Sequence, residues 1–191
     1  MDAILTSTAV VALAEIGDKT QLLAVVLATR FRRPVPIILG ILVATLANHF
    51  LAALVGQQVA HLLDSLWFRY AVGASFIAMA LWTLVPDSLD DEEATENAKF
   101  GAFLTTLIAF FVVEMGDKTQ VATIALGAQY QDVLSVMTGT TIGMMLANVP
   151  AVFLGHAIIE KAPLPVIRRV AASLFFVIGL WVTAQTAGWF G

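Results

Sequence analysis

The chain has 191 residues, of which 59% are hydrophobic and 13% are charged, with a net charge of −4 and no cysteine. Soluble domains carry roughly 25% charged residues, so this composition excludes a water-soluble globular protein and predicts an integral membrane protein in a lipid bilayer. The lack of cysteine excludes disulfides, thiolate zinc sites and iron–sulfur clusters. We expect no nucleic-acid partner.

Six apolar stretches are long enough to cross a membrane, because a hydrocarbon core of ~30 Å needs about 20 helical residues. The predicted spans are Ala3–Thr29, Val35–Ala60, Leu66–Val85, Phe100–Ala125, Val133–Ile159 and Val166–Ala187. The first stretch lacks the pattern of a cleaved signal peptide, so we expect it to be retained. An open β segment would leave backbone groups unpaired in lipid, so the fold predicted is an all-α polytopic membrane protein with six transmembrane helices.

Basic residues predict the orientation. The connections after the first, third and fifth spans, with the residues beside them, contain Arg30, Arg32, Arg33, Lys99, Lys161, Arg168 and Arg169, whereas the opposite side has Arg69. Because Lys and Arg are enriched on the cytoplasmic side, both termini are predicted on the non-cytoplasmic side. The acidic segment 86–99 is then a cytoplasmic linker, either a solvated connection or a cation-sensing loop.

The chain repeats itself after 99 residues. At this offset Glu15 matches Glu114, Asp18-Lys19-Thr20-Gln21 matches Asp117-Lys118-Thr119-Gln120, and Gly40 matches Gly139, while Asn48 matches Asn148 one residue out of step. We therefore predict a first three-helix repeat at 1–85 and a second at 100–191. Because three spans are an odd number, the second repeat must insert upside down. Inverted repeats of this kind are typical of transporters with a site at the midplane.

Each copy of Glu-x-Gly-Asp-Lys-Thr-Gln interrupts an apolar span. A single ionised side chain at such depth costs roughly 2.5–3.5 kcal/mol, so these groups are expected to face the bundle interior. On a continuous helix, residues i, i+3 and i+4 share a face, which would project Glu15, Asp18 and Lys19 together. The same spacing in the second repeat predicts that Glu15, Asp18, Glu114 and Asp117 surround one metal ion.

Carboxylate oxygens suit Ca²⁺, Mn²⁺ or Mg²⁺ rather than soft metals. Four carboxylates less two lysines leave a charge of −2, which one divalent cation or two protons would neutralise, so cation/proton exchange is the natural cycle. Lys19 and Lys118 could instead pair within their own helices with Glu15 and Glu114.

Other polar residues are predicted to support the site or the cation pathway, and the glycines permit close helix approach or local unwinding. The supporting residues are Lys19, Thr20, Gln21, Lys118, Thr119, Gln120, Asn48 and Asn148, and the glycines are Gly17 and Gly116. Under the shifted match His49 lies opposite Val149, so we interpret it as a packing residue.

The chain combines two motifs, Glu15-Ile-Gly-Asp-Lys-Thr20 and Glu114-Met-Gly-Asp-Lys-Thr119, with two three-helix halves and an acidic central loop. In these features it resembles a family of cation/proton exchangers. These carry a duplicated Glu-x-Gly-Asp-[Lys/Arg]-[Ser/Thr] signature and include Golgi manganese/calcium transporters and bacterial manganese exporters. The resemblance implies Mn²⁺, or else Ca²⁺, as transported substrate, protons as counter-ion and the acids of both motifs as ligands. It also implies no enzymatic activity and no resident cofactor. A bacterial member would export Mn²⁺ across the inner membrane as a monomer or homodimer.

Two alternatives stay open. An intramembrane aspartyl protease also uses Gly-Asp motifs on two helices, although its two motifs differ from each other, whereas these are near identical. A small-solute exporter, for amino acids, would share the topology but would need sites for both an ammonium and a carboxylate.

Overall fold

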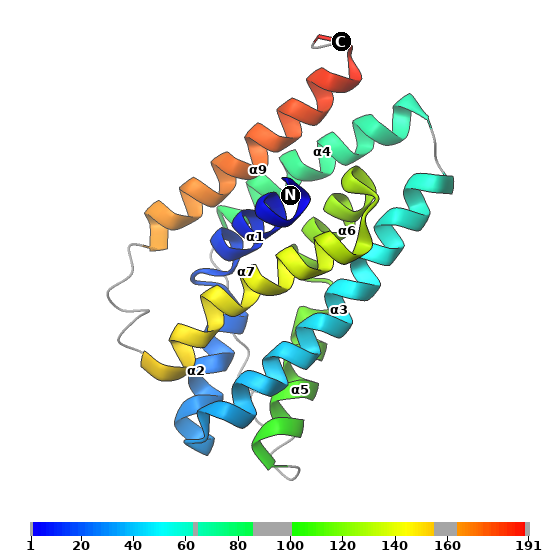
Figure 1. Ribbon diagram of the computed structural model, residues 1–191. Coiled ribbons are helices and arrows are strands. Elements are labelled where there is room, and N and C mark those ends of the chain that lie inside the picture. The colour runs from blue at the N-terminus through cyan, green and yellow to red at the C-terminus, as the bar shows by residue number, and fades with distance from the viewer. Residues whose placement is uncertain (1, 63–64, 86–100, 155–163, 190–191) are drawn as a thin grey trace.

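The computed structural model describes residues 2–62, 65–85, 101–154 and 164–189, and within them the only regular elements are helices. They are α1 (Asp2–Glu15), α2 (Lys19–Phe31), α3 (Pro34–Leu62), α4 (Leu66–Thr83), α5 (Gly101–Glu114), α6 (Lys118–Tyr130), α7 (Val133–Leu154) and α9 (Leu164–Thr186) (Figure 1). The all-α prediction is confirmed. The predicted linker 86–99 lies outside the described residues.

Among the described residues, three helices are long and apolar enough to cross a membrane on their own: Pro34–Ala60, Val133–Leu154 and Pro165–Thr186, with Gly101–Glu114 as a shorter apolar helix. The predicted continuous helices over Ala3–Thr29 and Phe100–Ala125 are wrong, because each is two helices separated by a break. With 14 and 13 residues, α1 and α2 are each shorter than the roughly 20 residues that a span requires.

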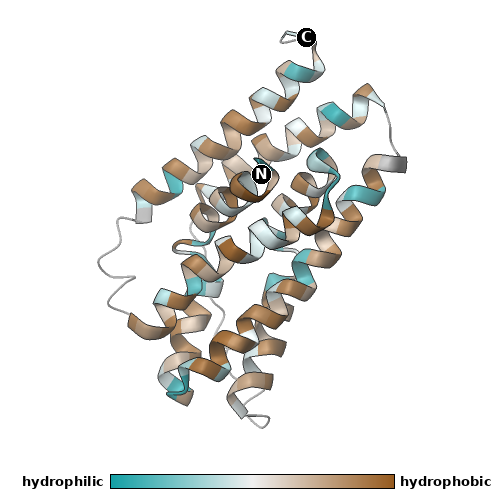
Figure 2. Ribbon diagram, viewed as in Figure 1, coloured by the Kyte–Doolittle hydropathy of each residue, from teal (hydrophilic) through white to brown (hydrophobic). Residues whose placement is uncertain are grey.

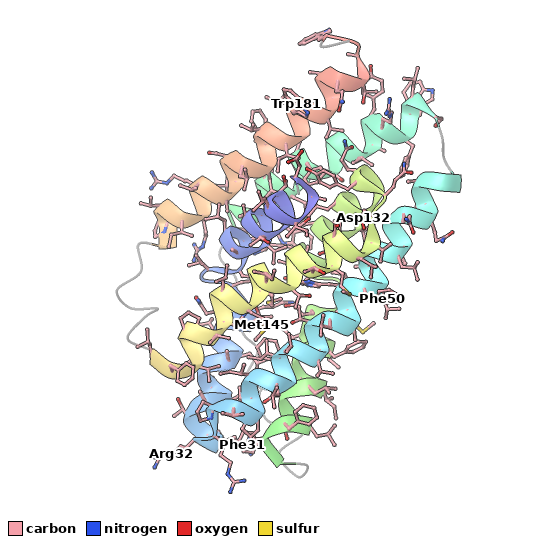
Figure 3. The ribbon with its side chains drawn as sticks, viewed as in Figure 1. Phe31, Arg32, Phe50, Asp132, Met145 and Trp181 are labelled. Carbon is pink, nitrogen blue, oxygen red and sulfur yellow. The ribbon has the colours of Figure 1, made fainter. Side chains whose placement is uncertain are left out.

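The long helices α3 and α7 run antiparallel through the middle of the molecule (Figure 1). Helix α1 packs along α7, and α5 packs along α3, so each repeat lays a short helix on the long helix of the other. Helices α4 and α9 form a separate pair that lies against α6 and α1. The turn at Arg32 and the turn at Asp132 lie far apart along the bundle (Figure 3).

The outer surface is apolar. Large hydrophobic side chains such as Leu51, Phe153 and Val177 are exposed, and Figure 2 shows brown, hydrophobic residues along the outside of α3, α7 and α9. A soluble monomer rarely exposes contiguous apolar surface on this scale. This surface is therefore suited to contact with lipid tails.

The interior contains two apolar clusters. The first includes Phe76, Met79, Leu126, Val136 and Phe175, and the second includes Leu23, Leu27, Ile37, Phe110 and Val152. The chain crosses from one cluster to the other between Ala14 and Leu23, and again between Val113 and Ala122. Both copies of the polar motif therefore lie at the boundary between the two clusters.

Small residues allow the helices to approach closely, as is common in membrane proteins. A Cβ added to Gly56 of α3 would stand 2.1 Å from the carbonyl oxygen of Ile124 in α6. We expect Gly56→Ala to lower the free energy of unfolding in detergent by about 1–3 kcal/mol, because the obstructing atom is backbone. Val55→Ile, which adds a methylene group on the exposed face beside it, is the control and should keep the wild-type free energy of unfolding. Equal stability of both variants would contradict the close α3–α6 contact.

Candidate metal centre

The two motifs form matching breaks between paired helices. Gly17 and Gly116 adopt φ angles of 82° and 78°, in the left-handed region that favours glycine. Each is followed by an extended aspartate, Asp18 or Asp117, that begins the next helix. Of the two roles predicted for these glycines, the geometry favours local unwinding. The interruption also means that Glu15, Asp18 and Lys19 do not share one face of a continuous helix.

The glutamines of the motif stabilise these breaks. The side-chain oxygen of Gln21 accepts a hydrogen bond from the backbone N–H of Gly17 at 2.9 Å, and Gln120 accepts one from Gly116 at 2.6 Å. Gln21 also donates its amide N–H to the carbonyl of Ala147 in α7 at 3.0 Å. These glutamines thus hold the unwound backbone in place.

The breaks bring carboxylates from both repeats together. Ligand oxygens of Glu15, Glu114 and Asp117 all lie within 4.8 Å of one another, and all three side chains are buried. Asp18 is also buried, at 2% exposure, but it lies outside this group of three. We call Glu15, Glu114 and Asp117 the carboxylate triad.

The two lysines pair across the repeats rather than within them. Lys118 Nζ lies 3.2 Å from Asp18 Oδ1, and Lys19 Nζ lies 3.3 Å from Asp117 Oδ1. The predicted pairing of each lysine with the glutamate of its own motif is therefore wrong, because the break turns the lysine away from that glutamate. Both aspartates have a cationic partner, whereas neither glutamate is paired with a lysine within the described ranges.

The threonines orient the glutamates. Thr20 donates its hydroxyl hydrogen to Glu15 Oε2 at 2.5 Å, and Thr119 donates to Glu114 Oε2 at 2.9 Å. These hydrogen bonds leave the other oxygen of each glutamate, Oε1, without a donor among the residues that the structure describes. Each threonine thus fixes its carboxylate while one oxygen stays available to a ligand.

The same pattern extends over the whole polar cluster. In the described part of the chain, the carboxylate and amide oxygens that are buried without a hydrogen-bond partner all belong to this cluster: Glu15 Oε1, Asp18 Oδ2, Glu114 Oε1, Asp117 Oδ2 and Asn148 Oδ1. An unpaired buried acceptor costs roughly 1–3 kcal/mol, and a cation bound to these oxygens would offset that cost. Hard oxygen donors of this kind suit Mn²⁺, Ca²⁺ or Mg²⁺.

The two asparagines are not equivalent. Asn148 in α7 reaches the site, with Nδ2 at 3.4 Å from Glu15 Oε2. Asn48 in α3 instead donates to the backbone carbonyl of Phe111 at 3.0 Å. The residue of α3 that reaches the carboxylates is His49, whose Nε2 lies 4.0 Å from Glu114 Oε2. Sequence reasoning missed it because the repeats were matched there one residue out of step.

This combination of a helical, apolar-surfaced bundle and a buried acidic cluster defines a membrane protein that handles cations. The sequence profile of one family, described as "Divalent cation/proton antiporter GDT1", matches the chain twice, over residues 3–91 and 102–189. The chain belongs to this family of divalent cation/proton antiporters. Members of this family are transporters and not enzymes, so the protease alternative is excluded. The family transports divalent cations, so the amino-acid exporter alternative is excluded as well.

Relatives match over nearly the whole chain. A Vibrio cholerae protein named "Putative manganese exporter" is 52% identical over 94% of this chain and 90% of its own length. "GDT1-like protein 5" of Arabidopsis thaliana is 28% identical, covering 91% of this chain and 92% of that protein. "GDT1-like protein sll0615" of Synechocystis is also 28% identical, covering 90% and 93%. No solved structure matches.

Proposed function

We propose that this protein exports Mn²⁺ from the cytoplasm in exchange for protons, at a site built from Glu15, Glu114 and Asp117 with Asp18 beside them. The observation that carries the proposal is the carboxylate triad, buried where two broken helices meet, with one oxygen of each side chain unpartnered among the described residues. Mn²⁺ rather than Ca²⁺ is proposed because the relative from Vibrio cholerae is named for manganese export.

The charges of the site support exchange. Lys19 and Lys118 neutralise Asp117 and Asp18. Among the ion pairs of the described residues, the two glutamates have no lysine or arginine partner and contribute a formal charge of −2. One divalent cation neutralises this charge, and two protons do the same once the cation has left. Because an uncompensated charge is costly at this depth, the empty and unprotonated site is the unfavourable state, and cation release is coupled to proton uptake.

The proposed topology has six spans in two inverted repeats, 1–85 and 100–191, joined by a cytoplasmic linker at 86–99. The first and fourth spans are each made of two half-helices, α1 with α2 and α5 with α6, whose breaks meet near the bilayer midplane. Discontinuous helices at the interface of inverted repeats form ion sites in other transporters, because their ends carry unpaired backbone groups.

Alternating access follows from the two apolar clusters. One cluster lies on each side of the motifs along the chain, so a cation must pass through one cluster to enter and through the other to leave. The repeats are in unequal environments: Lys19 is 22% exposed and Lys118 is 3% exposed. This asymmetry supports the interpretation that the structure represents one of the two conformations of an alternating-access cycle.

The proposed orientation puts the arginines at residues 30–33 in the cytoplasm and both termini outside, in a bacterial inner membrane. Arg32 and Asp132 lie far apart along the bundle (Figure 3), as alternate connections of a polytopic protein do. Because the two repeats supply all of the carboxylates, one chain is sufficient for a site, whether the protein is a monomer or a homodimer.

Transport in proteoliposomes tests the proposal. With the vesicle lumen more acidic than the medium, we expect Mn²⁺ to accumulate inside against its gradient as protons leave. Equal pH on both sides should abolish accumulation, and a reversed gradient should drive Mn²⁺ out. Protein-free vesicles measure the leak. Accumulation that is unchanged without a pH gradient would contradict proton exchange.

A further inference from the structure

His49 is a buried histidine whose ring nitrogens are unsatisfied. Its side chain is 0% exposed, and neither Nδ1 nor Nε2 has a hydrogen-bond partner in the parts of the chain that the structure describes. Glu114 Oε2 lies 4.0 Å from Nε2, which is too far for a hydrogen bond. A buried imidazole without partners costs free energy, and a bound cation would remove that cost at one nitrogen.

The structure also corrects the repeat match at this position. Gly40 of α3 packs against Phe103 and Thr106, and Gly139 of α7 packs against Ile4 and Ser7. Gly40 corresponds to Gly139, and the residues packed against them, Phe103 with Ile4 and Thr106 with Ser7, also differ by 99 positions without a shift.

At the same offset His49 corresponds to Asn148. Nδ2 of Asn148 lies 3.4 Å from Glu15 Oε2, and Nε2 of His49 lies 4.0 Å from Glu114 Oε2. The two glutamates that correspond in the sequence repeat each have a side chain from a long helix nearby, Asn148 of α7 beside Glu15 and His49 of α3 beside Glu114. One of these side chains is an amide and the other is an imidazole.

We propose that His49 is a ligand of the transported cation through an imidazole nitrogen, and that this nitrogen makes the site prefer a first-row transition metal ion over Ca²⁺ and Mg²⁺. The inference rests on the proposed function. The triad offers oxygens, which serve Ca²⁺, Mg²⁺ and Mn²⁺ alike. An imidazole nitrogen is a ligand that transition metals accept and that Ca²⁺ and Mg²⁺ bind poorly. His49 lies outside the triad of mutually close oxygens and supplies its nitrogen from the side of Glu114.

The experiment compares Mn²⁺ transport by wild type and His49→Asn with Ca²⁺ or Mg²⁺ as competitor. Asparagine reproduces the residue at the related position, Asn148, and so keeps a buried polar group of similar size. We expect the KM for Mn²⁺ to rise by roughly tenfold or more, as loss of a supporting group at a metal site does. The KM for Ca²⁺ should change less, because Ca²⁺ favours oxygen ligands, so the preference for Mn²⁺ should fall. His61→Asn, roughly 18 Å further along α3 at 1.5 Å per residue, should keep the wild-type preference.

Pulsed electron paramagnetic resonance of bound Mn²⁺ gives a second readout that does not require transport. Wild type and His61→Asn should show hyperfine coupling to an imidazole nitrogen, and His49→Asn should lack it. If His49→Asn does not fold, His49→Gln is measured in the same way. Unchanged metal preference, or nitrogen coupling that survives in the variant, overturns the role of His49 and leaves the exchanger intact. Wild-type protein that neither binds nor transports Mn²⁺ would instead overturn the proposed function itself.

Discussion

Glu15→Gln and Glu114→Gln are each expected to lower Mn²⁺/proton exchange by more than a hundredfold. Loss of an outer-shell partner of a metal ligand already costs roughly 10–100-fold, and these variants would remove a ligand oxygen. Glutamine keeps the shape and the acceptor for the threonine hydroxyl, so both variants should still fold. Each also removes one of the two charges that protons or the cation neutralise. Initial rates of pH-driven Mn²⁺ uptake in proteoliposomes measure the effect.

The matched control is Asp132→Asn, which removes a carboxylate outside the proposed spans. Asp132 precedes α7 and accepts a hydrogen bond from the backbone N–H of Ser135 at 3.1 Å; hydrogen bonds from Ser135 hold the pKa of Asp132 below its ordinary value. Asparagine caps a helix about as well as aspartate, so uptake should stay at the wild-type rate. Substantial flux through either glutamate variant would rule out a site that needs both repeats.

Lys118→Met is expected to cost about 3–5 kcal/mol of stability, because it leaves the buried Asp18 carboxylate without its cation. Both members of this pair are nearly inaccessible, at 3% and 1% side-chain exposure. The double variant Lys118→Met with Asp18→Asn should recover most of the loss, since the uncompensated charge is then absent. Denaturant titration of the purified protein in detergent provides the free energies of unfolding.

The related pair supplies the comparison. Lys19 is 22% exposed, so solvent screens the charge that remains on Asp117 after Lys19→Met, and the loss should be smaller. If Lys19→Met and Lys118→Met lowered the free energy of unfolding equally, and the double variant recovered none of it, burial would not determine how much each ion pair contributes to stability.

Much of the helix layout could be predicted from the sequence. The predicted spans Leu66–Val85 and Val166–Ala187 differ by about two residues from α4 and α9, because long apolar stretches bounded by prolines leave few alternatives. The broken spans could not be predicted in the same way. A glycine within an apolar stretch is compatible with a continuous helix as well as with the positive φ that Gly17 adopts. The break leaves backbone groups without helical partners, and the structure shows that Gln21 binds one of them, the N–H of Gly17.

The arrangement of charges also required the structure. Spacing along a helix suggested a partner for Lys118 four residues away, whereas its partner in the structure, Asp18, is separated from it by 100 residues. His49 was interpreted as a packing residue because Leu46-Ala47-Asn48 and Leu146-Ala147-Asn148 suggested a shifted match, whereas the packing of Gly40 and Gly139 supports the unshifted register. Such pairings depend on how two helices cross, which local spacing does not encode.

The sequence by itself determined that this is a helical membrane protein with a doubled acidic motif, since apolar length and buried charge are properties of composition and order. It also determined that carboxylates, rather than sulfur ligands, are the groups available to a cation. Only the tertiary structure decided which groups meet: three carboxylates close together, each lysine on the aspartate of the other repeat, and His49 beside Glu114. The physical reason is that the two breaks turn the motifs toward each other, and the contacts that matter then run between repeats.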